Sequence, residues 1–195
     1  MIDVSPLVEV DLDGAHGRRG EGTPATLDVA RRMDAACRVN GFFAITGHGV
    51  DPGLLPRLDG EARAFFARPE ADKAQVAMTR GGRAWRGWFP VGGELTSGVP
   101  DLKEGLYFGT ELTADHPRVR AATPLHGANL FPVDPPGLRP AVLAWLDALT
   151  TLAHQLMRGI ALGLVGLAPG PHRQQPVPGP AGVLQAGQGG ARIGD

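Results

Sequence analysis

Charged and aromatic side chains are concentrated between residues 83 and 110. Arg86 and Trp88 stand in a glycine-rich stretch, and the charged pair Lys103 and Glu104 follows it. Aromatic residues beside an arginine on such a loop suit a pocket wall that orients a carboxylate or another polar ligand. The alternative is a loop that its aromatic residues hold against the core, with ion pairs at the surface.

Neither a metal site nor a nucleophile is indicated by residue spacing. No histidine is followed two residues later by Asp or Glu, and there is no His-Glu-x-x-His motif. The two serines lie outside any Gly-x-Ser-x-Gly motif. The single cysteine, Cys37, excludes an internal disulfide and any multi-cysteine metal cluster. We predict a buried, unreactive thiol there, because Cys37 continues an apolar helix face.

His48 lies in the sequence Gly47-His48-Gly49, which lacks the third glycine of a dinucleotide-binding fingerprint. The imidazole could bind a ligand at the end of a strand. It could equally hydrogen-bond to nearby backbone and stabilise the turn that follows, and we favour this structural role.

Length and charge limit the class of protein further. A chain of 195 residues favours one domain, and 19 basic against 20 acidic residues give a net charge of −1. This balance gives no support for nucleic acid or an anionic membrane as partner. The longest apolar stretch, residues 159–168, is about half the length that a membrane span needs. We therefore expect a cytoplasmic protein.

The elements that must position these side chains follow from periodicity and capping residues. Thr23 and Pro24 begin a helix that ends at Asn40-Gly41, and Asp51 and Pro52 begin a second one that ends before Pro69. Further expected elements are helices over about 70–77 and 140–164, and strands over 2–12, 42–45 and 103–110. We expect an ordered loop over 80–101 and mostly irregular structure over 113–138. Residues 168–195 have five prolines, seven glycines and no aromatic residue, which predicts a disordered tail.

Five motifs occur in the order found in one enzyme family. The first motif is GFFAITGHGV, over residues 41–50. The other four follow in order: the Phe-Phe, Pro and Lys positions of 65–73, RGWFP over 86–90, DLKE over 101–104 and NLFP over 129–132. Together they resemble the N-terminal region of the isopenicillin N synthase-like non-haem dioxygenases. The resemblance implies an α+β fold, in which helices and a few strands flank a jelly roll. It also implies Fe(II) and 2-oxoglutarate as cofactors and a small-molecule substrate.

The resemblance covers residues 1–167, which we expect to form the N-terminal domain. In the family, His-x-Asp, a distal His and Arg-x-Ser hold iron and 2-oxoglutarate in the C-terminal half, and no residue here matches them. We therefore expect no catalytic or metal-binding residue, no cofactor and no activity in this chain alone. We expect that a truncated or frameshifted gene explains the missing C-terminal motifs. The alternatives are that the chain is an interaction module or one half of a split oxygenase.

For the substrate side, we predict a pocket wall formed by Arg86, Trp88 and Asn129, whereas Lys103 and Glu104 serve the strand structure. Without a jelly roll, the apolar face of the last helix would be exposed, which predicts self-association.

Overall fold

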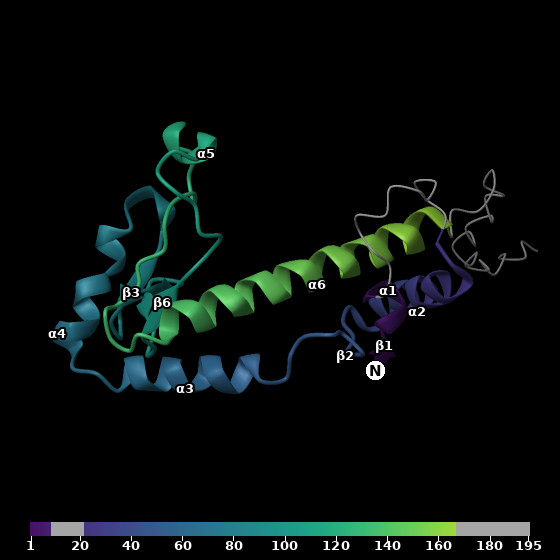
Figure 1. The fold of residues 1–195 in the computed structure, drawn as a ribbon, viewed down its shortest axis with the longest axis horizontal. Helices are drawn as coiled ribbons and strands as arrows, with labels where there is room; N and C mark the ends of the chain where they lie inside the picture. The colour runs from purple at the N-terminus through teal and green to yellow at the C-terminus, as the bar shows by residue number, and fades with distance from the viewer. Residues whose placement is uncertain (9–21, 167–195) are drawn as a thin grey trace, which may run out of the picture.

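A single long helix, α6 (Leu138–Gly166), joins two separate hydrophobic cores (Figure 1). The computed structural model describes residues 1–8 and 22–166, and the predicted tail lies outside these residues. The mixture of helices and small sheets confirms the α+β class. None of the helices in the described residues is long and apolar enough to span a membrane.

The first core lies at the C-terminal end of α6, where the N-terminal residues of the chain pack against it. There β1 (Ile2–Asp3) pairs in parallel with β2 (Ile45–Thr46), and α1 (Ser5–Val8) and α2 (Pro24–Asn40) pack against α6. Its buried members are aliphatic or sulfur-containing side chains: Ile2, Val4, Leu7, Val29 and Met33.

The capping signals of α2 are confirmed. The side chain of Thr23 accepts a hydrogen bond of 3.2 Å from the backbone N–H of Thr26, and Pro24 occupies the first turn. Gly41 has φ of 76°, a left-handed conformation that glycine adopts without a Cβ clash, and this ends the helix.

Two expectations about the N-terminal core are wrong. The strand predicted over 2–12 is only two residues long in the described part, and residues 9–12 lie outside it. The strand stops because Asp3 Oδ1 accepts a hydrogen bond from the Ser5 N–H and because Pro6 has no N–H to donate to a sheet. The strand predicted over 42–45 is reduced to Ile45–Thr46, and Phe42 is 77% exposed. The two-residue β1 offers no further backbone for it to pair with.

Cys37 is also exposed, contrary to the prediction of a buried thiol. The buried face of α2 runs through Val29 and Met33, and Ala36 continues it into the same cluster. Cys37 is the next residue, about 100° further around the helix, and so lies on the flank of that face.

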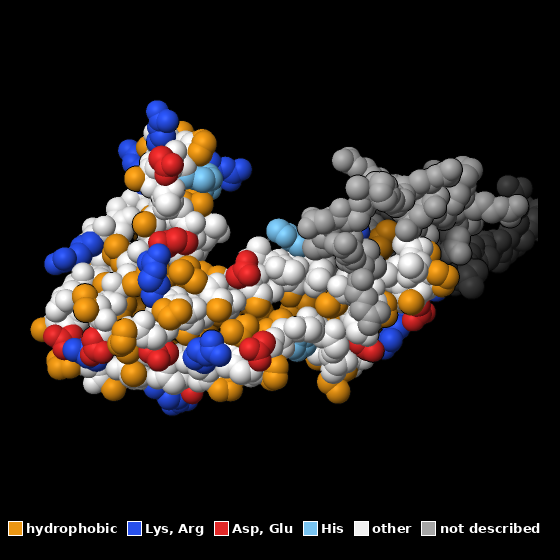
Figure 2. Space-filling model, viewed as in Figure 1, with side chains coloured by type: hydrophobic (Ala, Val, Ile, Leu, Met, Phe, Trp, Pro, Cys, Tyr) orange, Lys and Arg blue, Asp and Glu red, His pale blue; other side chains and the backbone are white. Residues whose placement is uncertain are grey.

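The second core lies at the other end of α6. It contains α3 (Leu54–Phe66), α4 (Glu70–Lys73), the 3-10 turn η1 (Ala74–Val76) and the antiparallel pair β3 (Gly87–Phe89) and β6 (Gly105–Tyr107). Its buried members are apolar residues from α3, η1, β3 and α6: Phe65, Val76, Trp88, Leu138 and Val142. Figure 2 shows hydrophobic side chains along the line where α3 runs beside α6.

Helix α3 begins later than expected. Asp51 Oδ1 accepts a 2.8 Å bond from the Gly53 N–H and so closes a turn before the helix, and Leu54 is the first helical residue. The helix ends at Phe66, before Pro69, as predicted. The expected helix over 70–77 is realised as α4 followed by η1.

The glycine-rich stretch over 80–101 is more structured than a loop. The 3-10 turn η2 (Met78–Arg80) ends at its first residue. The stretch then contains a second 3-10 turn, η3 (Gly82–Ala84), the buried strand β3, and the hairpin of β4 (Leu95–Thr96) and β5 (Val99–Pro100). The strand predicted over 103–110 is shorter, because β3 offers only three pairing residues. Residues 113–138 are irregular apart from α5 (Pro117–Arg120).

Phe65 and Phe42 offer a matched test of the second core. Phe65→Ala removes a ring that is fully buried, so we expect the free energy of unfolding to fall by about 3–5 kcal/mol. Phe42→Ala removes an exposed ring and should change it by less than about 0.5 kcal/mol. Urea unfolding followed by circular dichroism measures both, and equal effects would contradict the assignment of the core.

Candidate functional site

Two of the three predicted pocket residues meet at Gly109. Arg86 precedes β3, Gly109 follows β6, and Asn129 lies in the irregular segment before α6. A Cβ atom at Gly109 would collide with the guanidinium of Arg86, so a larger residue there would displace this side chain. The third residue, Trp88, points from β3 into the second core and is 4% exposed.

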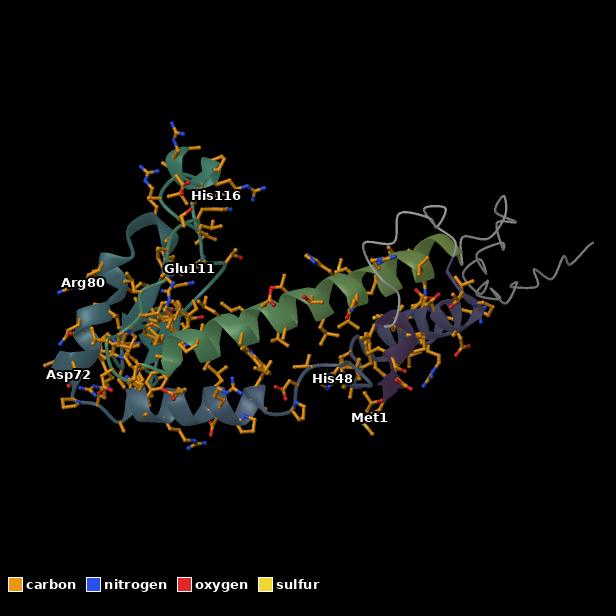
Figure 3. All side chains as sticks on the ribbon, in the orientation of Figure 1. Met1, His48, Asp72, Arg80, Glu111 and His116 are labelled. Atoms are coloured by element: carbon orange, nitrogen blue, oxygen red, sulfur yellow. The ribbon has the colours of Figure 1, made fainter. Side chains whose placement is uncertain are left out.

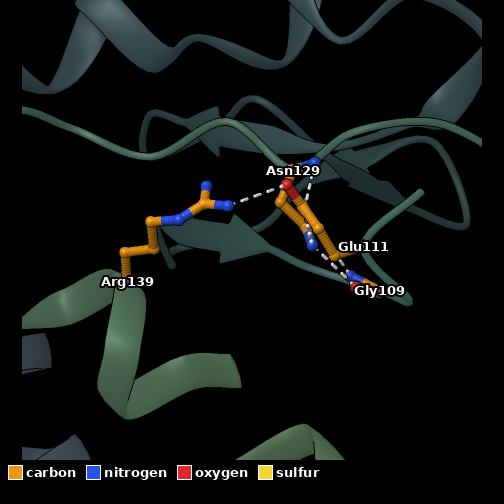
Figure 4. Close-up of polar contacts among 4 residues, drawn as sticks. All are labelled: Gly109, Glu111, Asn129 and Arg139. Atoms are coloured by element: carbon orange, nitrogen blue, oxygen red, sulfur yellow. Dashed lines mark hydrogen bonds and ion pairs between the residues drawn. The ribbon is translucent and has the colours of Figure 1, made fainter. Parts of the chain in front are cut away.

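Asn129 is buried and closes a set of four hydrogen bonds with its neighbours (Figure 4). Its Oδ1 accepts a 2.8 Å bond from the Gly109 N–H, and its Nδ2 donates to the Gly109 carbonyl at 2.8 Å. Nδ2 and the Asn129 backbone N–H also donate to Glu111 Oε2, at 2.6 and 2.9 Å. Asn129 therefore holds the chain after β6 against the segment that leads into α6.

Glu111 extends this arrangement to the first turn of α6. Arg139 donates to Glu111 Oε1 at 3.3 Å (Figure 4). The Arg139 guanidinium also lies 4.8 Å from the centre of the Phe131 ring. Phe131 in turn stacks on Phe108 at 5.0 Å. The carboxylate thus links three segments that are distant in sequence.

Arg86 is the least satisfied charged residue of the site. One of its terminal nitrogens donates to the Leu125 carbonyl at 3.1 Å, while its buried Nε has no hydrogen-bond partner in the described structure. Burial lowers the pKa of Arg86, although the charge of Glu111 opposes this shift. A partly desolvated cation with an unused donor favours an anionic partner.

Trp88 belongs to a second polar cluster, which ties β3 and β6 to α4. Its indole Nε1 donates to Glu104 Oε2 at 2.8 Å, and Lys73 Nζ donates to the same oxygen at 2.7 Å. Lys73 also donates to the Phe66 carbonyl at 3.2 Å and lies 5.5 Å from the centre of the Trp88 ring. Burial raises the pKa of Glu104, but the hydrogen bonds from Lys73 and Trp88 outweigh it and lower the pKa overall.

Lys103 lies in a separate surface network that joins the β4–β5 hairpin to β6. Its Nζ is 3.1 Å from Glu94 Oε2 and 3.2 Å from Asp101 Oδ2, and the Tyr107 hydroxyl donates to Glu94 Oε1 at 2.7 Å. These bonds lower the pKa of Glu94 and raise those of Tyr107 and Lys103. At neutral pH Glu94 is therefore charged and Tyr107 keeps its proton.

Lys73, Gly109 and Glu111 carry much of this geometry, and the sequence assigned none of them to the site. Lys73 is one of only two lysines in the chain and stands in the motif after Pro69, which was an available signal. Gly109 and Glu111 gave no comparable signal, because their roles depend on Asn129, about 20 residues later.

The described residues hold no group of three or more His, Cys, Asp or Glu side chains that could bind a metal ion. His48 and His116 lie in distant parts of the molecule (Figure 3), and each accepts a bond from nearby backbone through Nδ1, from Val50 and Arg118 respectively. The iron that the resemblance implies therefore finds no ligand set among these residues, and we assign no chemical step to it here.

Comparison with known proteins identifies a family for this chain. Residues 5–134 match the family described as "non-haem dioxygenase in morphine synthesis N-terminal". A probable iron/ascorbate oxidoreductase of Dictyostelium discoideum is 42% identical over 170 residues, which cover 84% of this chain and 47% of that protein. Isopenicillin N synthase of Hapsidospora chrysogena is 31% identical over 167 residues, which cover 84% of this chain and 45% of that protein.

A solved structure supports the same relationship. The crystal structure of a 2OG-Fe(II) oxygenase family protein from Caulobacter crescentus has a TM-score of 0.61 and 26% identity, and the match covers 72% of this chain and 45% of that one. The chain thus spans about half the length of the relatives it matches. The family expected from the five sequence motifs is confirmed.

Glu104 makes the stability of the second core depend on pH. The pKa of this carboxyl is lower in the folded chain than its ordinary value near 4.5. The stability that the charged carboxylate contributes is therefore fully present when the pH is above that ordinary pKa, and it is lost as the pH falls through the pKa of the folded chain. We expect Glu104→Gln to cost about 1–3 kcal/mol at pH 7 and progressively less below about pH 4.

Urea unfolding of wild type and variant across this pH range tests the prediction. Glu70→Gln is the control, since Glu70 is exposed and has no ion pair in the described structure. It should change the free energy of unfolding by less than about 0.5 kcal/mol. A Glu104→Gln effect that does not vary with pH would contradict the role of the charged carboxylate.

Proposed function

Since the chain belongs to the non-haem dioxygenase family, whose N-terminal region it matches, we propose that it forms the substrate side of an Fe(II)- and 2-oxoglutarate-dependent oxidoreductase acting on a small organic substrate. The match over residues 5–134 is the observation that carries the proposal. Residues 1–167 act as the N-terminal domain of such an enzyme. When bound to a complete enzyme, the iron and 2-oxoglutarate supply the oxidising chemistry.

Within this domain, Arg86 is the residue we assign to substrate binding. Its guanidinium is half-buried beside Gly109, burial lowers its pKa, and its Nε lacks a partner in the described structure. A carboxylate of the substrate would neutralise the charge of this partly desolvated guanidinium. Asn129 and Trp88 act on either side of it, Asn129 by holding Gly109 in place and Trp88 by holding β3 in the core.

The proposal places iron and 2-oxoglutarate binding outside the described residues, because these contain no metal-binding cluster. The chain alone is then expected to bind no iron stoichiometrically and to release no succinate from 2-oxoglutarate. Iron titration and an assay for succinate, with Fe(II), ascorbate and oxygen present, test this division. Stoichiometric iron binding together with succinate release would contradict it.

A second candidate function is a non-catalytic interaction module, or one half of a split oxygenase. Exposed large apolar side chains on α6 and elsewhere favour contact with another protein surface. An adjacent reading frame that encodes His-x-Asp, a distal His and Arg-x-Ser would distinguish the split enzyme from the module.

Arg86 provides a direct test of the substrate side. We expect small organic carboxylates to bind the full chain with a Kd on the order of 1 mM, followed by the fluorescence of the neighbouring Trp85 and Trp88. Arg86→Met should weaken this binding at least about tenfold, and Arg86→Lys should restore only part of it, because lysine lacks the planar guanidinium.

Arg83→Met is the matched control, because Arg83 is exposed and its side chain makes one hydrogen bond in the described structure, to the Ala122 carbonyl at 3.4 Å. It should leave the binding unchanged. Equal affinities of wild type and Arg86→Met, with both proteins folded by circular dichroism, would refute the role of Arg86 while leaving the family assignment intact.

A further inference from the structure

The turn over residues 122–125, which follows α5, holds the guanidinium of Arg86 from one side. The Leu125 carbonyl accepts the 3.1 Å bond from Arg86, and the Leu125 N–H donates to the Arg83 carbonyl at 2.8 Å. The bond to Arg86 joins residues that are 39 positions apart in the sequence. The turn is therefore part of what places the Arg86 side chain.

This turn has a backbone conformation that most side chains disfavour. Ala122 and Leu125 have φ of 53° and 63°, in the left-handed region that residues with a Cβ rarely adopt. Gly127, just after the turn, lies so close to Ala84 that a Cβ atom at residue 127 would be 2.7 Å from the Ala84 Cβ. Because strained backbone persists only where its surroundings hold it, the contacts of the turn decide where the Leu125 carbonyl lies.

His126 supplies two of these contacts, and the chemistry of its partners fixes the position of its proton. Nδ1 lies 2.8 Å from the Pro124 carbonyl, which can only accept, so Nδ1 carries the hydrogen. Nε2 lies 3.2 Å from a terminal nitrogen of Arg118, which can only donate, so Nε2 has no hydrogen. Only the neutral imidazole makes both bonds.

We propose that neutral His126 positions the guanidinium of Arg86, so that the position of Arg86 depends on pH. A second hydrogen, on Nε2, faces the Arg118 guanidinium, and the two cations repel each other. Arg118 also closes the turn, because its carbonyl accepts from the Thr123 N–H at 2.9 Å. Its displacement therefore releases the turn and the Leu125 carbonyl. Weaker carboxylate binding at low pH follows, and this part rests on the function proposed for Arg86.

The charged and titratable groups around the turn are mostly basic. They come from α5 and the residues just before it, and from the segment across the turn: Arg118, Arg120, Asp115, His116, Arg83 and Arg86. A proton on His126 therefore adds to an excess of positive charge. His116 also acts as a neutral acceptor, since its Nδ1 caps α5 by accepting the Arg118 N–H at 3.3 Å, so its effect must be separated from that of His126.

Nitrogen-15 NMR of the full chain tests the positioning role without any ligand. At about pH 7.5 we expect the ring hydrogen on Nδ1 in His126 and on Nε2 in His116. As the pH falls to about 5.5, the Arg86 Nε–H signal should shift with the same midpoint as the His126 ring. In His126→Asn that signal should stay fixed, because asparagine keeps a donor for the Pro124 carbonyl but takes up no proton.

Titration with propionate, a small organic carboxylate, measures the effect on binding. From about pH 7.5 to 5.5 the wild-type Kd should rise at least about fivefold, whereas that of His126→Asn should change by less than about twofold. His126→Leu lacks both bonds and should show the raised Kd already at about pH 7.5. Arg118→Met should also remove the pH dependence, because it removes the opposing cation.

Two further histidines provide the controls. His116→Asn keeps an acceptor for the N-cap of α5 without titrating, and His154→Asn changes an exposed histidine of α6. Both variants should keep the wild-type dependence of the Kd on pH. A dependence that His116→Asn abolishes would overturn the assignment to His126.

The outcomes also distinguish this inference from the function on which its binding part rests. An Arg86 Nε–H signal that does not follow the His126 titration overturns the inference, even where propionate binds at Arg86. A His126 hydrogen found on Nε2, or a pH dependence that His126→Asn leaves intact, does the same. An Arg86 signal that follows His126 in a chain that binds no propionate supports the positioning role and contradicts the proposed function.

Discussion

The burial of α6 at both of its ends is the constraint on which the rest of the structure depends. Leu138 and Val142 complete the core around Phe65 and Trp88, while Leu156 and Ile160 pack on the core around Met33. The strands in both cores are only two or three residues long, and strands this short cannot be stable without a packed face. The helix therefore sets where the two cores lie relative to each other, and with them the segment that carries Arg86.

Around the candidate site, polar side chains rather than long strands hold the chain. Asn129 and Glu111 connect the end of β6 to the start of α6, and Glu104 connects both strands of the β3–β6 pair to Lys73. Each of these groups is bonded on more than one side, which makes its burial tolerable. Arg86 differs because one donor lacks a partner in the described structure. Binding sites commonly contain such an unsatisfied charge within an otherwise satisfied surrounding.

The sequence predicted well wherever the controlling interaction is local. Thr23, Pro24 and Gly41 define the ends of α2 through groups within a few residues, and the apolar periodicity of α6 needs no partner to be recognised. It failed where pairing depends on distant backbone. Phe42 was expected in a buried strand, but β1 is too short to pair with it. Cys37 was expected on the packed face, but α2 turns Ala36 toward the core.

For the site, the sequence by itself determined the family, the segment that carries Arg86, Trp88 and Asn129, and the types of side chain available for chemistry. Only the tertiary structure decided which of them lie together. It separated Trp88, which lies in the core, from Arg86 and Asn129, which meet at Gly109. The physical reason is that a hydrogen bond or a desolvation effect depends on distance in space, and residues 86, 109 and 129 come together only when the chain has folded.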